Sequence, residues 1–209
     1  MRRTFKKINL FLTIALVFLI SSHCSLYRGL IGPVGPDGAK AAYNRGDYAT
    51  AFEEFSILAE QGDPKAQFNL GLMYQEGQGT PRNYAQAAKW YRKAAHQGIA
   101  SAQNNLGLLY HDGRGIPQDY VQAATWFRRA ADQGDPEAQN NLGVMYYRSE
   151  EVPLDYVQAY KWFKLSSQAG NQNAAKRRDF LAGKMTSQQL EQAENLVKAW
   201  KPKKESNQP

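Results

Sequence analysis

Cysteine is almost absent from this sequence of 209 residues, in which Cys24 is the only one. A single cysteine excludes a disulfide within the chain and any metal cluster built from several thiolates. It does not reveal which redox compartment the protein occupies.

Histidine is also scarce, and the three histidines do not form a recognisable site. His23 lies in the N-terminal segment, His96 near the end of one expected helix and His111 at the end of another. No repeated acid pair, serine motif or metal-ligand spacing accompanies them, and His111 beside Asp112 is best explained as a solvated pair. We therefore predict no catalytic residues, no metal site and no cofactor, and we expect that the protein is not an enzyme.

A long hydrophobic run is found only at residues 8–20, after a basic start of the chain. As a helix this run would rise about 20 Å, short of the roughly 30 Å hydrocarbon core of a membrane. The pattern predicts a secretory signal peptide over residues 1–24, cleaved after Cys24 or Ser22, and no stable membrane span after cleavage. The leading expectation is thus a periplasmic or secreted protein. The alternatives are a lipoprotein acylated at Cys24, although His23 stands where that signal expects a small residue, and an uncleaved N-terminal anchor.

Excess charge is missing from the body of the chain. The formal net charge of +7 includes four basic residues among the first seven, and much of the remainder lies after residue 175. Nucleic-acid binding requires a basic stripe on the folded surface, whereas the middle of the sequence is close to neutral. We therefore expect no nucleic-acid partner.

What the sequence does contain is a repeat with a period of 36 residues, marked by Trp90, Trp126 and Trp162. Such self-similarity is typical of a solenoid, in which each unit buries its apolar face against its neighbours. The predicted repeats span about residues 63–98, 99–134 and 135–170. A linker over 25–37 and a divergent unit over 38–62 precede them, capping helices over 171–200 follow, and a disordered tail is expected over 201–209.

Each repeat carries the signals of two helices. Asp63-Pro64 and Asp135-Pro136 place an N-cap side chain before a proline at the first helical position. The second helix presents aromatic residues and alanines at spacings of three and four, which predicts an internal packed stripe that includes the tryptophans, rather than a surface for stacking on sugars.

Glycines recur at fixed places in the repeats. One position in the first helix is always glycine: Gly71, Gly107 and Gly143. Each costs about 1 kcal/mol relative to alanine in a helix, so we expect close approach of the partner helix there. The loop Gly77-Gln78-Gly79 is not followed by the lysine and serine of a phosphate-binding loop and predicts a turn. Ser149 and Glu151 replace these loop glycines in the third copy, where the backbone is expected to differ.

The motifs Ala-x-x-x-Leu-Gly-x-x-Tyr, Gly-x-Gly-x-Pro-x-x-Tyr, Ala-x-x-Trp-Phe/Tyr and Ala-Ala-x-Gln-Gly follow one another in this order. They resemble the Sel-one-like repeat (SLR) family, relatives of tetratricopeptide repeats, over about residues 38–200. The resemblance implies an all-α fold, a right-handed α-solenoid of antiparallel helix pairs, and a role as an adaptor for other proteins. Bacterial members are often exported and have been linked to signalling, envelope assembly and contact with host cells.

In tetratricopeptide-like superhelices the first helix of each pair lines the concave side, which the resemblance makes the expected binding surface. Removing the buried stripe leaves twelve candidate partner contacts: Lys65, Phe68, Leu72, Gln75, Ser101, Asn104, Leu108, His111, Glu137, Asn140, Val144 and Tyr147. Amides such as Asn104 and Asn140 can hold the backbone of an extended peptide. Two structural alternatives stay open. The aliphatic residues among the twelve can pack between adjacent first helices, and Asn69, Asn105 and Asn141 can bond a neighbouring turn.

The leading hypothesis is an exported scaffold that binds a protein or peptide partner on the concave face. A second hypothesis is a cell-wall or β-lactam hydrolase, suggested by cysteine-rich members of the resembled family that have been described as β-lactamases. This chain departs from that subgroup, because its repeats contain no cysteine. A third hypothesis is a polysaccharide-binding envelope component.

Overall fold

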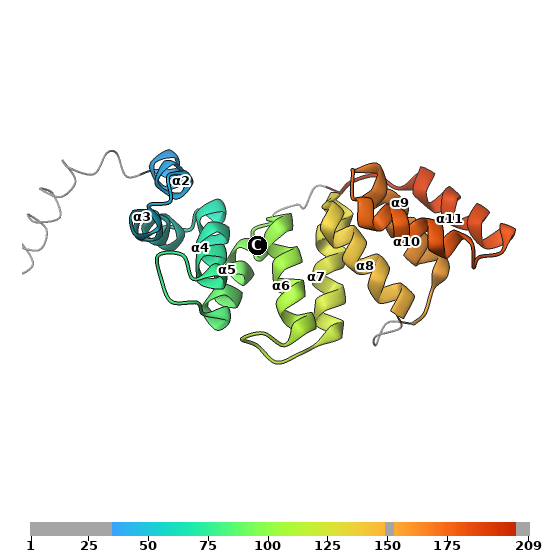
Figure 1. Ribbon diagram of the computed structural model, residues 1–209, viewed down its shortest axis with the longest axis horizontal. Helices are drawn as coiled ribbons and strands as arrows, with labels where there is room; N and C mark the ends of the chain where they lie inside the picture. Colours follow the sequence, from blue (N-terminus) through green and yellow to red (C-terminus); the bar gives the residue numbers. More distant parts are fainter. Residues whose placement is uncertain (1–34, 149–152, 204–209) are drawn as a thin grey trace, which may run out of the picture.

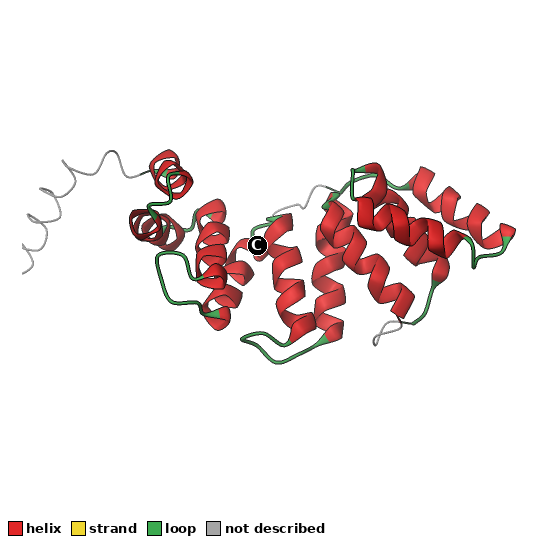
Figure 2. Ribbon diagram, in the orientation of Figure 1, coloured by secondary structure: helices red, strands yellow, loops and turns green. Residues whose placement is uncertain are grey.

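The computed structural model describes residues 35–148 and 153–203, and the regular structure within these ranges is helical (Figures 1 and 2). The helices are α2 (Pro36–Asn44), α3 (Tyr48–Glu60), α4 (Pro64–Glu76), α5 (Tyr84–His96), α6 (Ala100–Asp112), α7 (Tyr120–Gln133), α8 (Pro136–Arg148), α9 (Tyr156–Gln168), α10 (Gln172–Ala182) and α11 (Ser187–Ala199). From α2 to α10, helices adjacent in the sequence pack side by side along an elongated body, and α11 packs against α9. This arrangement confirms the predicted α-solenoid.

Short polar side chains cap the starts of several helices, including the two Asp-Pro starts that the sequence predicts. Asp63 Oδ1 accepts a hydrogen bond from the backbone N–H of Ala66 at 2.7 Å, and Asp135 Oδ1 accepts one from Ala138 at 2.8 Å. The second helices α5, α7 and α9 are capped in the same way by Asn83, Asp119 and Asp155. These caps satisfy backbone donors that a helix start leaves unpaired.

The recurring glycine marks the closest approach within each helix pair. A β-carbon at Gly71 on α4 would lie 2.6 Å from the ring of Tyr91 on α5, and one at Gly107 on α6 would lie 2.7 Å from the ring of Phe127 on α7. These distances are shorter than real carbon contacts, so any side chain at these positions would force the helices apart. The predicted close approach is confirmed.

The repeat tryptophans belong to the core. Trp90, Trp126 and Trp162 are 4%, 6% and 0% exposed. Basic side chains cover the outer edges of two rings, with Lys93 Nζ 4.0 Å from the Trp90 ring centre and Lys161 Nζ 4.0 Å from that of Trp162. The burial confirms the packing interpretation, and these three rings are not available for stacking on sugars.

A buried glutamine joins the first helix of each repeat to the preceding unit. Gln103 Nε2 donates to the carbonyl oxygen of Ala95 at 3.0 Å, and its Oε1 accepts from Gln133 Nε2 at 2.9 Å. Gln67 makes the same two kinds of bond in the first repeat. In the third repeat Ala169 replaces the donor glutamine, and Gln139 Oε1 has no hydrogen-bond partner in the described part of the chain.

The divergent N-terminal unit is a shortened helix pair. α2 begins at Pro36, two residues before the predicted start of the solenoid. Gly46 (φ 79°) forms a tight turn into α3, in a left-handed conformation that glycine adopts without a steric cost. Tyr43 then donates a hydrogen bond to Gln78 Oε1 at 2.8 Å, which ties this unit to the loop of the first repeat.

The C-terminal unit departs from the repeat pattern. α10 packs against α9 as expected, but α11 also makes its main helix contact with α9. Beyond α11, the backbone N–H of Lys203 donates to the carbonyl oxygen of Asp132 at 2.8 Å, and Lys203 Nζ lies 3.0 Å from Asp132 Oδ2. Disorder was expected from residue 201, but residues 201–203 are held in place, because the end of α7 offers an unpaired carbonyl and an opposite charge.

Several predictions concern residues outside the described ranges. These are the signal peptide over 1–24, most of the linker over 25–37, the altered loop at Ser149 and Glu151, and the tail beyond Lys203. None of the described helices is long and apolar enough to cross a membrane.

Candidate partner-binding surface

Contacts between the first helices of successive repeats support their expected placement on the inner side of the array. α6 contacts α8 directly, and Asn141 Nδ2 on α8 donates to Asn104 Oδ1 on α6 at 3.0 Å. The second helices α3 and α5 are bridged by the long side chains of Lys93 and Glu60, which approach to 3.9 Å. Since the inner edge of a curved array is the shorter one, this contact supports placing α4, α6 and α8 on the concave side.

The two amides expected to bind a peptide are buried within the array. Asn104 and Asn140 are 7% and 6% exposed. Asn104 Oδ1 accepts from Asn141, and Asn140 Oδ1 accepts from Arg177 Nη1 on α10. Because both oxygens are engaged by the next unit, these amides join neighbouring repeats. The expectation that they stand open to a peptide backbone is corrected. Asn141 does have a structural contact, but its partner is a side chain of the preceding first helix and not a neighbouring turn.

Apolar side chains occupy the middle of the concave face. Leu108 on α6 is 37% exposed. Phe68 and Leu72 on α4 are half-buried, and the Phe68 ring lies 5.9 Å from that of Tyr91. Leu72 and Val144 contact core clusters, so the alternative of packing between helices holds in part for them. Leu108 has the largest exposed fraction of these four side chains.

Polar residues mark the N-terminal ends of the same helices. Lys65, Ser101 and Glu137 are exposed at the first turns of α4, α6 and α8. Glu137 Oε1 accepts a hydrogen bond from Asn171 Nδ2 at 2.9 Å, which links it to the start of α10. This edge therefore carries a basic, a neutral and an acidic group in successive repeats.

At the opposite ends of these helices, the expected contact residues already have partners. Gln75 Oε1 accepts from the Tyr91 hydroxyl at 3.0 Å. Burial raises the pKa of Tyr91 well above its usual range, so its hydroxyl stays a donor at neutral pH. His111 Nδ1 lies 2.8 Å from Asp112 Oδ1, and its ring lies 5.3 Å from that of Tyr120. These contacts serve packing and turn structure.

A pocket of about 90 Å³ lies at the C-terminal end of the concave face, where α8, α9 and α10 meet. It is lined by Val144, Tyr147, Arg148, Phe163, Arg177 and Phe180. Two of these, Val144 and Tyr147, were predicted contacts, whereas Arg177 and Phe180 were assigned to the cap. Continuing the 36-residue period beyond Asn141 and Val144 reaches Arg177 and Phe180, so the signal was present in the sequence.

A coupled pair of titratable groups fastens α11 to α9. The Tyr160 hydroxyl donates to Glu194 Oε1 at 2.7 Å, and Lys164 Nζ lies 3.2 Å from the same oxygen. The hydrogen bond from Tyr160 lowers the pKa of Glu194. Burial, with the bond to Glu194, raises the pKa of Tyr160 to about 12. Both shifts favour the neutral phenol and the charged carboxylate in the folded state.

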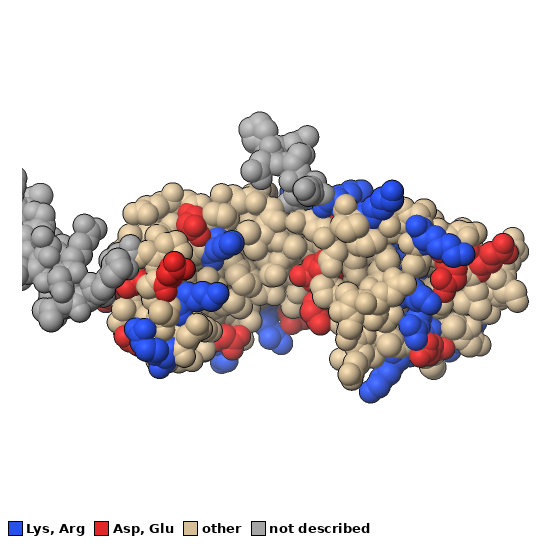
Figure 3. Space-filling model, turned by 90° about the horizontal axis from the view of Figure 1, so that it is seen from above, with Lys and Arg blue, Asp and Glu red and all other residues tan. Residues whose placement is uncertain are grey.

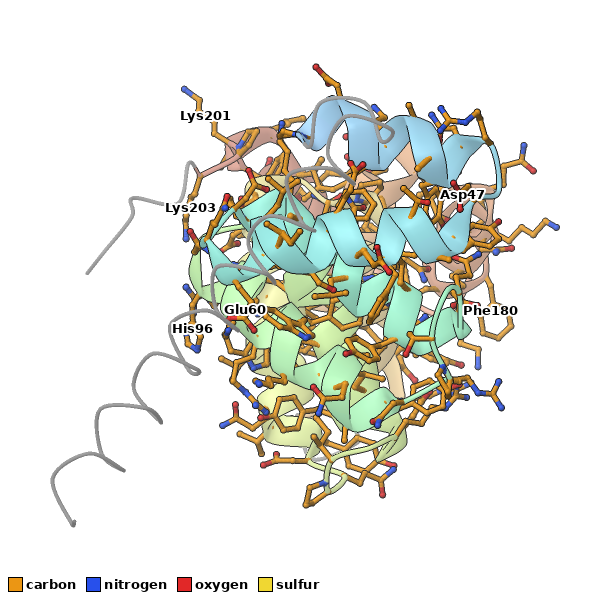
Figure 4. All side chains as sticks on the ribbon, turned by 90° about the vertical axis from the view of Figure 1, so that its left-hand side faces the viewer. Asp47, Glu60, His96, Phe180, Lys201 and Lys203 are labelled. Carbon is orange, nitrogen blue, oxygen red and sulfur yellow. The ribbon has the colours of Figure 1, made fainter. Side chains whose placement is uncertain are left out.

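The described residues bring no catalytic constellation together. In residues 35–148 and 153–203, no group of three or more His, Cys, Asp and Glu side chains is placed to hold a metal ion. The His96 ring packs 5.3 Å from Trp126, and Figure 4 places His96 on the edge of the molecule opposite Phe180. On the face seen in Figure 3, acidic and basic side chains are interspersed and form no continuous basic stripe.

The repeat unit matches a known family. The description of the Sel1 repeat fits residues 64–99, 100–135 and 136–171, which together make up more than half of the chain. The protein belongs to the Sel1 repeat family. Sel1 repeats generally form scaffolds for protein–protein interactions, so the coarse function implied by the sequence resemblance is supported.

Two solved bacterial structures share this Sel1 fold. A Sel1 repeat protein from Oxalobacter formigenes has a TM-score of 0.66 and 31% identity, over 69% of this chain and 59% of the other. A protective antigen with an SLR fold from uropathogenic Escherichia coli has a TM-score of 0.69 and 34% identity, over 83% of this chain and 42% of the other. Among curated proteins, DAP3-binding cell death enhancer 1 from rat and from mouse is 48% identical over 42 residues, which is 20% of this chain and 8% of either relative. The chain thus spans only part of each protein it matches.

Proposed function

We propose that this Sel1 repeat protein is an exported scaffold that binds a protein or peptide partner along its concave face. One observation carries the choice of face. Leu108 lies in the middle of the central first helix and is 37% exposed. Phe68 and Leu72 extend this apolar surface on α4. Burying such side chains against a partner is the usual source of binding free energy on a helical groove.

The proposed face is tested by a charge placed in its centre. Leu108→Glu should reduce the amount of partner recovered from envelope extract by at least tenfold, because a buried, unpaired carboxylate opposes association. Val121→Glu on α7 is the matched control, since Val121 is 56% exposed on a second helix. If Val121→Glu reduces partner recovery and Leu108→Glu leaves it unchanged, the partner binds the other face.

Export is a separate part of the proposal and rests on the sequence of residues 1–24. Mass spectrometry of the mature N-terminus, combined with cell fractionation, distinguishes its forms. A chain beginning at Ser25 or His23 in the periplasm or medium is the expected result. An acylated Cys24 would indicate a lipoprotein, an intact Met1 in the membrane an anchored protein, and an intact Met1 in the cytoplasm would refute export.

A further inference from the structure

The pocket at the C-terminal end of the concave face has an apolar floor and a basic rim. Its floor is formed by Val144 of α8 and Phe163 of α9, and Phe163 is almost completely buried. Phe180 of α10 is 57% exposed, and its ring lies edge-to-face with Tyr147 at 6.3 Å. Together, Phe180 and Tyr147 give the cavity an exposed aromatic margin, and contiguous apolar surface rimmed by polar groups is typical of interaction sites.

Two aromatic residues of the pocket, Tyr147 and Phe180, are specific to this end of the array. Tyr147 occupies the position held by Gln75 in the first repeat and by His111 in the second. Phe180 occupies the position held by the aliphatic Leu108. Since the first two repeats complete the same fold with the smaller or more polar residues, the fold does not require the aromatic rings found here.

The charge changes sign at the same end. Arg148 ends α8 where Glu76 ends α4 and Asp112 ends α6, and one period later Lys184 follows α10. Arg177 stands one period after Asn141 and lines the pocket with Arg148. No acidic side chain is found among the described residues that line the pocket. The first helices therefore end in acids in two repeats and in a base beside the pocket.

We propose that this pocket, which we call the Arg–Phe pocket, binds a peptide segment of a partner through one apolar side chain flanked by acidic side chains. The apolar side chain enters the cavity between Tyr147 and Phe180, and the carboxylates bind Arg148 and Arg177 at the rim. The inference rests on the proposed function, because it specifies the partner chemistry at one end of the same concave face.

The size and hydrogen-bonding capacity of the pocket suit this ligand. A volume of about 90 Å³ is well below the roughly 300–1,000 Å³ of small-molecule sites, and it suits a single side chain. Arg177 donates from Nη1 to Asn140 Oδ1, which orients its guanidinium, and a guanidinium has further N–H donors for a carboxylate. Lys184 Nζ, 4.6 Å from the centre of the Phe180 ring, adds positive charge.

The docked C-terminal residues 201–203 do not fill the pocket. Figure 4 places Phe180 on the edge of the molecule opposite Lys201 and Lys203, where Lys203 is bound to Asp132 at the end of α7. The docked residues 201–203 therefore lie away from the pocket. Because the two rim arginines belong to different helices, acidic side chains on both sides of the apolar residue match the rim better than a single chain end does.

The test uses labelled peptides and fluorescence anisotropy. The full chain should bind an amidated Gly-Ser-Glu-Leu-Glu-Ser-Gly peptide at least tenfold more tightly than the same peptide with Gln-Leu-Gln or Glu-Ala-Glu at its centre, and 0.5 M salt should weaken the binding. Arg148→Glu and Phe180→Ala should each reduce affinity at least tenfold, whereas Lys40→Glu, at an exposed lysine of α2 outside the candidate contacts, should leave it within twofold. Circular dichroism confirms that the variants are folded.

Equal binding of the Glu-Leu-Glu and Gln-Leu-Gln peptides would overturn the proposal, as would full affinity in Arg148→Glu. If the protein instead prefers a peptide with a free carboxyl terminus and no acidic side chain, the proposal is wrong and the pocket recognises a chain end. If no peptide binds while Leu108→Glu still abolishes partner recovery, the Arg–Phe pocket is not a site and the scaffold function stands. If no peptide binds and Leu108→Glu also leaves partner recovery unchanged, both the Arg–Phe pocket and the proposed concave-face function are rejected.

Discussion

Two regions of the molecule can be compared: the first two repeats, and the third repeat with its C-terminal unit. They have the same pattern of core residues but differ outside the core. In both regions the tryptophan is buried and a glycine touches an aromatic ring of the partner helix. In the first two repeats the buried glutamine is fully paired, whereas Gln139 in the third has an unpaired oxygen. The comparison shows that helix packing tolerates little change from copy to copy, while hydrogen bonds between units and the charge at helix ends can change.

The shared core predicts the largest effect. Trp126→Ala should destabilise the protein by about 3–5 kcal/mol, because it leaves a cavity between the first two repeats. Trp162→Ala in the third repeat should cost at least as much, since Trp162 is 0% exposed. Denaturant unfolding followed by circular dichroism measures both. A Trp126 variant as stable as the wild type would show that the two regions do not share the same core.

Glycine at the helix contact is the next test. Gly107→Ala should cost about 1–3 kcal/mol, because the new methyl group would lie 2.7 Å from the Phe127 ring. Gly183→Ala is the control, since its new methyl group would meet nothing closer than 3.6 Å. A thermal melt compares them. Equal midpoints for the two variants would mean that the helix pair adjusts without strain.

The unpaired glutamine distinguishes the two regions directly. Ala169→Gln should stabilise the protein by about 0.5–1.5 kcal/mol by supplying the donor that Gln139 Oε1 lacks. The reverse change in the second repeat, Gln133→Ala, should destabilise by about 1–3 kcal/mol, because it removes a partner of buried Gln103. Urea unfolding gives both free energies. If Ala169→Gln is neutral, the third repeat satisfies this oxygen in another way.

The smallest expected effect concerns pH and the attachment of α11. The pKa of Glu194 is lowered in the folded state, so its contribution is present above the unfolded value of 4.5 and is lost as the pH falls through the folded value. We expect a contribution of about 1 kcal/mol or less, since the carboxylate is partly exposed. Stability measured from pH 6 to pH 3 should fall less steeply in Glu194→Gln than in the wild type.

Tyr160 provides the matching test at high pH. Its pKa is raised to about 12, so its contribution is complete below the unfolded value of 10.0 and is lost as the pH rises towards 12. Tyr160→Phe should remove that part of the decrease in folding stability at alkaline pH. An unchanged alkaline profile in this variant would show that the phenol does not stabilise the contact between α9 and α11.

Much of the fold could be predicted from single residues because it depends on local rules. The Asp-Pro starts, the turn at Gly46 and the glycines against aromatic rings all follow from backbone and steric requirements. The candidate site was predicted less well. Asn104 shares a face of α6 with Leu108, and Asn140 holds the equivalent position on α8. Which of these side chains is covered depends on the distance to the next repeat, and the sequence period does not give that distance.

By itself, the sequence determined the helix pairs, their order and the residues of their core, because a 36-residue repeat allows each unit to bury its apolar stripe only against its neighbours. Only the tertiary structure decided that the amides join adjacent repeats, that α11 returns to α9, and that Lys203 reaches Asp132. It also decided that Arg177 and Phe180 meet Val144 and Tyr147 in one pocket. These contacts depend on how neighbouring units are placed in space, which local helix signals do not specify.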